Sequence, residues 1–328
     1  MAHRHSAAWE QATVLESILV ADTVRRIVLD VPGHPARSRA GAHLDVVIPA
    51  SKREIIRSYS VVDDGRRPEG VSIAVRLAPH SRGGSTFMHT LQAGDALRVS
   101  PPLRSFALTT RRVPCVLLAG GIGITPLIGM ARVLRDRGQD YQLHYAGRRG
   151  SDMPFLTELR ADHPDRVHIA VDERGERVDI PKLVEGLAPA AELYVCGPPG
   201  MLAAAARAWA ADGRPAGLLR FESFGSGGTQ PAEPFDVWVP RLGIRTRVPA
   251  ESTAAEALER AGAEVMTDCL RGECGLCVVP VLEVDCHLDH RDVFLSQRQK
   301  NLDTEMALCV SRATGGTVCV DLPRRPGP

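Results

Sequence analysis

Five of the chain's eight cysteines crowd into the stretch between positions 269 and 309. Three of them follow the spacing C-x4-C-x2-C, namely Cys269, Cys274 and Cys277. Thiolates with this spacing, completed by a distant fourth cysteine, hold a 2Fe–2S cluster of the plant type. Gly272 and Gly275 lie within the run, where a residue without a side chain lets the backbone come close and turn its N–H groups toward the sulfur atoms. The spacing therefore predicts an iron–sulfur cluster.

The fourth ligand of this cluster has three candidates. Cys286 follows Cys277 by only nine residues, which leaves little chain to form a strand and return. Cys319 lies in an alternating, strand-like sequence and is expected to serve packing. Cys309 is therefore the preferred ligand, and Cys319 is the alternative. A structural zinc site is the alternative for the whole run, but such sites more often use paired C-x2-C knuckles, and only one is present here.

Two strings in the first third of the chain carry groups that suit a flavin. The first string is Arg57, Ser58, Tyr59, Ser60. An arginine suits a phosphate, a tyrosine can stack on a planar ring, and a serine can hydrogen-bond to a ring nitrogen. The second string is Ser81, Arg82, Gly83, Gly84, Ser85, which resembles an anion-binding nest before a helix predicted at residues 86–91. An ordinary glycine turn with a serine cap is the alternative for the second string.

A glycine-rich turn after a buried strand predicts a dinucleotide site. Residues 113–119 begin with a continuous apolar run, typical of a strand in a parallel sheet. The turn that follows carries Gly120, Gly121, Gly123, Thr125 and Pro126. Its glycines let a pyrophosphate approach the next helix, and its proline suits the first turn of that helix. The third glycine of the standard Rossmann fingerprint is missing.

A second junction of this kind carries the string Cys196, Gly197, Pro198, Pro199, Gly200, Met201. The junction is expected at the C-terminal edge of the sheet, where open α/β sheets bind their ligands. A buried thiol at the end of a strand is the alternative for Cys196.

The elements that must position these residues fall into three segments and a linker. Residues 9–108 carry short strand-like runs punctuated by Gly, Pro and Asp, which predicts an antiparallel β-barrel or sandwich. Residues 109–225 alternate strands and helices, which predicts an α/β domain with a mostly parallel sheet. Residues 226–234 form a linker rich in Gly and Pro. In residues 235–328, a predicted hairpin (235–239 with 244–248) precedes a helix whose capping box is Thr253 and Glu256, and the cysteine run follows.

The composition is that of a globular protein whose partners are not polyanions. Apolar residues make up 44% of the chain and charged residues 24%, with a formal net charge of +1. Nucleic acid and anionic membranes both need a dense basic face, so neither is expected as a partner. No apolar segment resembles a secretory signal or reaches the ~20 residues that span a bilayer, which predicts a cytoplasmic protein. Thiols stay reduced in that compartment, so the cysteines need an explanation other than disulfides.

Taken in this order, the motifs resemble the ferredoxin–NADP reductase superfamily. The order of barrel, nucleotide domain and C-terminal ferredoxin narrows the resemblance to the phthalate dioxygenase reductase family, which includes vanillate O-demethylase reductases. The resemblance covers essentially the whole chain, and residues 221–225 and 309–313 are two further marks of it. The interval from Cys277 to Cys309 is a few residues longer than the family leads us to expect.

The resemblance implies a flavin β-barrel, an α/β nucleotide domain and a β-grasp ferredoxin domain, with FMN rather than FAD as the flavin. It places Thr125 and Cys196 beside the nicotinamide, and Phe224 where the family closes the flavin pocket. The expected catalytic residues are Ser60, Thr125, Cys196 and Phe224. The expected cofactor-binding residues are Arg57, Ser58, Tyr59, Ser60, Arg82, Gly83, Gly84, Ser85, Gly120, Gly121, Gly123, Thr125, Pro126, Arg148, Cys196, Gly197, Pro198 and Met201. The expected metal ligands are Cys269, Cys274, Cys277 and Cys309.

The implied activity is transfer of electrons from NADH through FMN and the cluster to a separate Rieske-type terminal oxygenase, by a monomeric chain. The alternatives are a reductase for another acceptor, such as a cytochrome P450, and a non-catalytic redox sensor. Arg148 and Arg149 follow the second strand of the nucleotide domain, where a 2′-phosphate can be read, so NADPH stays open beside NADH. His287 and His290 are expected at the surface rather than as ligands of a Rieske centre.

Overall fold

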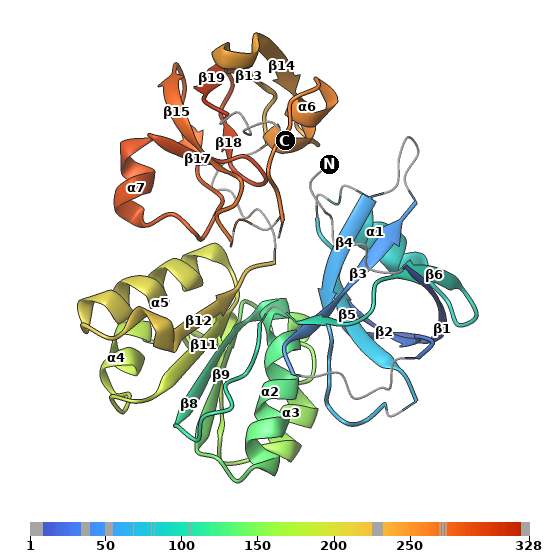
Figure 1. Ribbon diagram of the computed structural model, residues 1–328. Coiled ribbons are helices and arrows are strands. Elements are labelled where there is room, and N and C mark those ends of the chain that lie inside the picture. Colours follow the sequence, from blue (N-terminus) through green and yellow to red (C-terminus); the bar gives the residue numbers. More distant parts are fainter. Residues whose placement is uncertain are drawn as a thin grey trace. The chain divides into compact units, whose positions relative to one another are not determined.

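The computed structural model describes residues 9–33, 40–49, 55–67, 69–79, 81, 83–104, 106–224, 232–268, 270, 272 and 274–322. Of these described residues, those from Trp9 to Glu222 form one compact unit, and those from Ser223 onward belong to a second. The first unit contains an antiparallel and a parallel sheet, and the second contains a mixed sheet (Figure 1). The predicted domain boundaries stay a prediction. No helix within the described ranges is both long and apolar enough to cross a membrane.

The first sheet is antiparallel and closes on itself, because the two strands at the ends of its spatial order also meet. Its elements are β1 (Glu10–Ala21), β2 (Val24–Asp30), β3 (Ala42–Ile48), β4 (Ile55–Ser60), β5 (Val71–Arg76), β6 (Ala96–Val99), β7 (Leu103–Arg104) and helix α1 (Gly84–Thr90). The strand order is β4-β3-β6-β1-β2-β5, with β7 on β3. Val61, directly after β4, bridges to Ile73 on β5, and the Val62 N–H donates to the Ser72 carbonyl at 2.8 Å. This closure removes the free edges and confirms the predicted antiparallel barrel.

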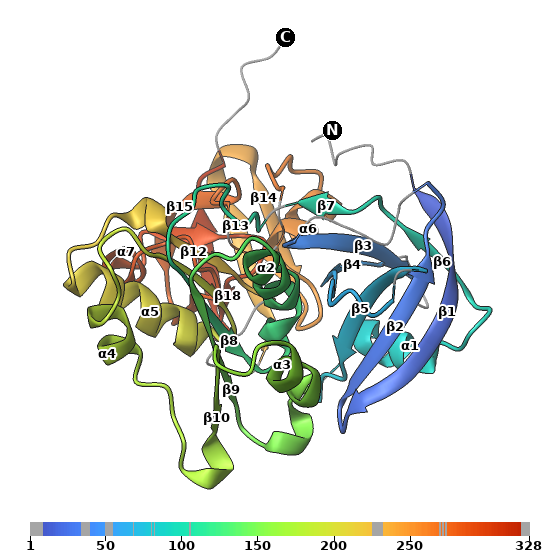
Figure 2. The same ribbon diagram turned by 90° about the horizontal axis from the view of Figure 1, so that it is seen from below.

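The second sheet is parallel, in the order β10-β9-β8-β11-β12. Its elements are β8 (Cys115–Gly120), β9 (Tyr141–Gly147), β10 (Val167–Val171), β11 (Glu192–Cys196), β12 (Leu219–Glu222), α2 (Ile124–Asp136), α3 (Leu156–Asp162), α4 (Ile180–Glu185) and α5 (Pro199–Ala211). Helices α2 and α3 cover one face of the sheet, and α4 and α5 cover the other (Figures 1 and 2). From β8 the chain adds β9 and then β10 on one side of the sheet, and from β11 it adds β12 on the other side. Open α/β sheets bind ligands at such a switch point, so the turns after β8 and β11 mark the site.

The third sheet is mixed, in the order β14-β13-β19-β15-β17, with β13 and β19 parallel. Its unit contains β13 (Phe235–Val239), β14 (Ile244–Val248), β15 (Val278–Val284), β16 (Leu288–Asp289), β17 (Glu305–Ala307), β18 (Arg312–Ala313), β19 (Thr317–Val320), α6 (Ala254–Arg260) and α7 (Gln297–Leu302). The predicted hairpin is confirmed as β13 and β14, and both hydrogen bonds of the Thr253–Glu256 capping box are present. Helix α6 packs its alanines and Leu258 into the core of the mixed sheet, as a β-grasp ferredoxin domain requires.

A buried arginine ties the end of the predicted linker to this third unit. Arg312 is 4% exposed, and its guanidinium donates to the carbonyls of Ser252, Pro249 and Glu233. It also lies 5.2 Å from the centre of the Phe235 ring. Because one buried guanidinium donates to three carbonyls from separate stretches of the chain, Arg312 stabilises the entry of the chain into the unit.

Candidate flavin, nucleotide and cysteine sites

Two of the predicted cluster ligands lie in contact. Cys277 directly precedes β15, and Cys309 follows β17 by two residues. These strands pair antiparallel with Val278 opposite Ala307, so the pairing brings the two cysteines to the same end of the ladder. Their Sγ atoms are 3.0 Å apart and both side chains are buried. The strand register thus explains a contact between residues 32 positions apart.

The other cysteines differ in their surroundings. Cys274 is exposed, and Cys269 lies outside the described residues. Cys319 lies on β19 opposite Trp238 and Glu283, and Cys286 lies beside Gly316 in the turn after β15. Of the three candidates for a fourth ligand, Cys309 is therefore the one that the structure places against Cys277. Within the described part of the chain, no group of three or more His, Cys, Asp or Glu side chains is arranged to hold a metal ion.

The two glycines of the cysteine run occupy positions that exclude a side chain. Gly272 has φ +74°, and a Cβ there would lie 2.7 Å from Val310 Cγ2. Gly275 has φ +76°, and a Cβ there would lie 2.3 Å from the Phe294 ring. Both residues therefore need the left-handed conformation and the close approach that only glycine allows. The loop is wrapped tightly against its surroundings, which fits a chain that folds around a compact cluster.

The cysteines also differ in acidity. The Cys309 thiol beside Cys277 lowers the pKa of Cys277 to about 7, although burial acts in the opposite direction. Burial raises the pKa of Cys286 to about 11, and burial also raises the pKa of Cys319. Iron is bound by the thiolate and not by the thiol. The chemistry of the Cys277–Cys309 pair therefore fits a cluster better than that of the other two candidates.

One expectation about the histidines of this unit was wrong. His287 is exposed as predicted, but the His290 side chain is only 7% exposed. Its Nε2 lies 2.8 Å from Asp303, and its Nδ1 lies 3.9 Å from Asp292. The contact of Nε2 with the Asp303 carboxylate offsets part of the cost of burying this polar ring.

The predicted flavin string, residues 57–60, lies on strand β4. Tyr59 is partly buried, and the loss of solvent around its phenol raises its pKa, so the phenol stays neutral. The Ser58 hydroxyl donates to Asp45 on β3 at 2.5 Å. Arg57 lies under α1, because a Cβ on Gly84 would be 3.2 Å from Arg57 Cγ. The structure therefore brings the Arg57 side chain and the start of α1 together, as a phosphate site requires.

Helix α1 begins two residues earlier than predicted. Gly83 caps it in the left-handed conformation at φ +91°, and Gly84 and Ser85 already belong to its first turn. The Ser85 hydroxyl accepts from the Ala78 N–H at 3.0 Å and donates to Ser81, also at 3.0 Å. The prediction missed this start because Gly84 has low helix propensity, whereas in the structure the Arg57 side chain packs closely against this position. Arg82 of the predicted nest lies outside the described residues.

A buried carboxylate next to the flavin string was not predicted as a site residue. Glu222, the last residue of β12, is 2% exposed, and its Oε2 accepts from the Ser60 hydroxyl at 3.3 Å. The two residues are 162 positions apart, which is why spacing could not reveal the contact. A signal was present all the same, because an acidic residue ending a strand at the ligand-binding edge of an α/β sheet is a candidate for function.

The two glycine-bearing turns of the nucleotide domain pack against each other. A Cβ on Gly123 would lie 2.1 Å from the Cys196 carbonyl oxygen, and one on Gly120 would lie 2.5 Å from Pro198 Cδ. A Cβ on Gly197 would lie 2.7 Å from the Met201 sulfur. The predicted strings after β8 and β11 thus meet at the switch point, and glycine is what allows their backbones to meet. Gly121, at φ +54°, opens the turn that leads into α2.

The structure also shows where four further predicted site residues lie. The Thr125 hydroxyl donates to the Ile122 carbonyl at 3.0 Å, and both Thr125 and Cys196 are buried. Arg148 is exposed at the end of β9, where its carbonyl accepts from the Glu173 N–H. Phe224 is 40% exposed and lies two residues beyond β12, at the start of the second compact unit.

Three family models match successive parts of the chain. The oxidoreductase FAD-binding domain matches residues 11–107, the oxidoreductase NAD-binding domain matches residues 117–207, and the 2Fe-2S iron-sulfur cluster binding domain matches residues 240–314. They follow one another in the same order as the barrel, the parallel sheet and the mixed sheet.

Known proteins resemble most of the chain. The heme-dependent oxidative N-demethylase beta subunit of Ectopseudomonas mendocina is 36% identical over 284 residues, which cover 86% of this chain and 89% of that one. Phthalate dioxygenase reductase of Burkholderia cepacia is 34% identical over 293 residues, which cover 86% and 87%. A solved structure of phthalate dioxygenase reductase, described as modular for electron transfer from pyridine nucleotides to 2Fe–2S, matches with a TM-score of 0.74 at 32% identity, covering 97% and 99%.

A solved type IV self-sufficient cytochrome P450 monooxygenase also matches, with a TM-score of 0.66 at 35% identity. The match covers 96% of this chain but only 41% of that chain. Matches above 30% identity over 86% of the chain, together with the three main sheets and three family models in one order, establish the relationship. The chain belongs to the phthalate dioxygenase reductase-like family and is an NAD(P)H-dependent flavin and 2Fe–2S oxidoreductase, the reductase component of an oxygenase system.

Proposed function

We propose that this reductase carries electrons from NADH through FMN and a 2Fe–2S cluster to a separate Rieske-type terminal oxygenase, as a cytoplasmic monomer. The observation that carries the proposal is the contact of Cys277 Sγ with Cys309 Sγ at 3.0 Å, on a loop that two obligatory glycines wrap tightly. Cys269 and Cys274 complete the proposed ligand set. A plant-type cluster at about −400 mV can reduce a Rieske centre at roughly −150 mV or above, so the direction of transfer is favourable.

A bound flavin supplies the conversion of a hydride, which carries two electrons, into the single electrons that the cluster accepts. The chain's own residues would prepare that site. Arg57 would bind the flavin phosphate beside the start of α1. Tyr59 would present a neutral ring to the flavin, because its phenol stays protonated. Ser60 would offer a hydroxyl whose orientation Glu222 holds.

Glu222→Gln tests the Ser60–Glu222 pair. Glutamine keeps the shape but weakens the acceptor for the Ser60 hydroxyl, because the hydrogen bond loses its charged partner. We expect the rate of flavin reduction by NADH to fall by about 10-fold, because a hydrogen bond to a charged group is stronger than a neutral one by roughly 1–1.5 kcal/mol. Stopped-flow absorbance of the flavin measures it. Glu176→Gln is the matched control, since Glu176 caps the Val171 N–H near the C-terminal end of β10 without touching the flavin string. An unchanged rate in Glu222→Gln contradicts the role.

The flavin itself is tested by releasing it from the purified protein with acid and separating FMN from FAD by chromatography. FMN is expected, because the resemblance to the phthalate dioxygenase reductase family implies FMN rather than FAD, and a single phosphate would suit Arg57 and the start of α1. Release of FAD contradicts this part of the proposal.

NADH is the proposed coenzyme. The Arg149 guanidinium already donates to Asp152 at 2.9 and 2.6 Å, and the end of β10 next to it carries Asp172 and Glu173. Two carboxylates near a 2′-phosphate repel it. We therefore expect a higher kcat/KM for NADH than for NADPH, measured in the same assay. The opposite ratio would contradict the choice of NADH and leave Arg148 and Arg149 as the candidates for binding a 2′-phosphate.

The acceptor is tested with purified proteins under anaerobic conditions. Reductase reduced with NADH is mixed with a Rieske-type oxygenase or with a heme oxygenase, and reduction of each acceptor is followed by its own absorbance. Faster reduction of the Rieske protein supports the proposal. Faster reduction of the heme protein favours a second candidate, a reductase for a heme oxygenase, which the relationship to a heme-dependent N-demethylase subunit suggests.

A further inference from the structure

A charged loop of the barrel holds one helix of the nucleotide domain at two points. The loop follows β4, and its Asp63 carboxylate accepts from Arg132 Nη2 on α2 at 2.6 Å. The Asp63 carbonyl accepts from Arg132 Nε at 3.1 Å. The two side chains are 7% and 19% exposed. A two-point contact between a buried carboxylate and a mostly buried guanidinium fixes an angle as well as a distance, which a single exposed ion pair does not.

The surrounding backbone is shaped for this contact. Gly129 lies one helical turn before Arg132, and a Cβ there would be 3.2 Å from Asp63 Cβ, so the helix surface leaves room for the loop. Gly65, at φ +76°, turns the chain just after the contact, and a Cβ there would be 3.5 Å from Arg132 Cδ. Both glycines therefore let the loop lie directly on α2.

The loop is also fixed to the barrel from the other side. Asp64 accepts from both Nη atoms of Arg26 on β2, at 2.8 and 3.1 Å. Arg26 in turn donates to the Ser72 hydroxyl on β5 at 2.8 Å. Arg26 and Asp64 are both buried, with side chains 4% and 6% exposed. The loop cannot move on the barrel without breaking this pair, so any movement of α2 relative to the barrel acts on Asp63 and Arg132.

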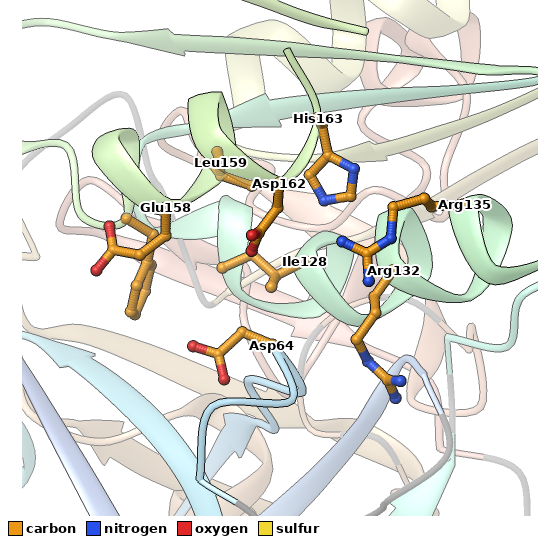
Figure 3. Close-up of a pocket in the computed structure, with 9 residues that line it drawn as sticks. Asp64, Ile128, Arg132, Arg135, Glu158, Leu159, Asp162 and His163 are labelled. Atoms are coloured by element: carbon orange, nitrogen blue, oxygen red, sulfur yellow. The ribbon is translucent and has the colours of Figure 1, made fainter.

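The space beside this contact is not a ligand site. The cavity between α2, α3 and the loop has a volume of about 10 Å³ and is lined by Asp64, Arg132, Arg135, Asp162 and His163 among others (Figure 3). That volume is room for no more than about one water molecule. At its rim, Arg66 pairs with Asp162 at 2.9 Å, but the two side chains are 42% and 30% exposed, and pairs reached by solvent contribute less than buried ones. The buried Asp63–Arg132 contact is therefore the feature with a candidate role.

Both ends of this contact lead directly to the proposed site. Asp63 is three residues beyond Ser60 on the flavin strand, and Arg132 is on the helix that begins at the turn of Gly120–Gly123. We infer that Asp63 and Arg132 form a positioning pair that sets the separation between the flavin strand β4 and the nucleotide turn, and so the approach of the nicotinamide to the flavin. The inference rests on the proposed placement of FMN at β4 and of NADH at this turn.

The test compares Asp63→Asn and Arg132→Gln with wild type in single-turnover reduction of the flavin by saturating NADH. Because a displacement of about 1 Å in a reactive complex can slow reaction by up to ~100-fold, we expect each variant to be roughly 10-fold slower. The Kd for NADH should stay within about twofold, since the groups that bind it are untouched. The charge-transfer absorbance of the complex between flavin and nicotinamide should weaken, which a change of stability alone would not cause. Arg135→Gln is the matched control, because Arg135 lies on the same helix and pairs only with the adjacent Asp136 among its described hydrogen bonds.

Three further outcomes decide the inference. The double variant should be no slower than either single variant, because the two residues act as one contact. Arg132→Lys keeps the charge and should recover part of the rate, and it also serves if either of the first two variants fails to fold. The inference is overturned if Asp63→Asn and Arg132→Gln both keep the wild-type rate of flavin reduction and the wild-type charge-transfer absorbance. A wild-type protein that holds no flavin, or whose flavin NADH does not reduce, shows instead that the proposed function is wrong.

Discussion

Cys309→Ser is expected to abolish loading of the cluster. The change removes one of two sulfur atoms that lie 3.0 Å apart, and a serine hydroxyl is a far harder and more weakly acidic ligand for iron than a thiolate. Iron bound per chain should fall from about two atoms to near none, with loss of the cluster absorbance and of its electron paramagnetic resonance signal after reduction. Reduction of cytochrome c by NADH should be lost with it. Reduction of ferricyanide, which can take electrons from the flavin directly, should persist.

Cys319→Ser is the matched control for this prediction. Cys319 is buried like Cys309, but it lies on β19 opposite Trp238 and Glu283. It should keep its iron and its cytochrome c activity, with no more than a modest loss of stability. Loss of the cluster in Cys319→Ser and its retention in Cys309→Ser would show that the fourth ligand was wrongly assigned. The ferricyanide activity separates that outcome from a general failure to fold.

Gly123→Ala is expected to lower kcat/KM for NADH by about 100-fold, the loss that follows when reacting groups are displaced by roughly 1 Å. The added Cβ would lie 2.1 Å from the Cys196 carbonyl oxygen, and backbone on both sides leaves no flexible group to yield. The turns after β8 and β11 must therefore separate, which disturbs both predicted nucleotide strings at once. The overpacking should also cost about 1–3 kcal/mol of stability. Steady-state kinetics and a thermal melt measure the two effects.

Gly200→Ala is the control for this steric argument. Gly200 belongs to the same region at the start of α5, but a Cβ there would meet nothing within 4 Å. Alanine should be tolerated with near wild-type kinetics and equal or slightly higher stability, because alanine has the higher helix propensity. Flavin content and cluster absorbance are measured in both variants, since both groups bind elsewhere. Equal kcat/KM values in Gly123→Ala and Gly200→Ala contradict the close packing of the two turns.

Much of the local structure was predictable because short spacings encode it. The Thr253–Glu256 capping box forms as expected, since its two hydrogen bonds involve residues only three apart. The hairpin of β13 and β14 follows from alternation of apolar residues on either side of a turn. Gly272 and Gly275 were predicted to let the backbone of the cysteine run come close to other groups. The structure explains why glycine is needed, because both residues have positive φ values and both lie in close contact with their surroundings.

Other features could not be predicted from spacing, because they join segments that are distant in sequence. Ser60 meets Glu222 across 162 positions, and Asp63 meets Arg132 across 69. The buried His290 ring also meets a carboxylate, that of Asp303, which the folded chain brings to it. In each case the chemical character of the residue was visible, whereas its partner was not. Nothing in a local pattern specifies which of many acidic or basic residues a given side chain will meet.

The sequence by itself determined the order of the three domains and the type of chemistry, because cysteine spacing, glycine turns and strand periodicity act over a few residues each. The tertiary structure alone decided which residues work together. It placed Cys309 against Cys277 through the register of β15 and β17, and it placed Glu222 behind Ser60. It also laid the loop of Asp63 on α2. The physical reason is that these contacts depend on strand register and helix packing, which the whole fold sets cooperatively.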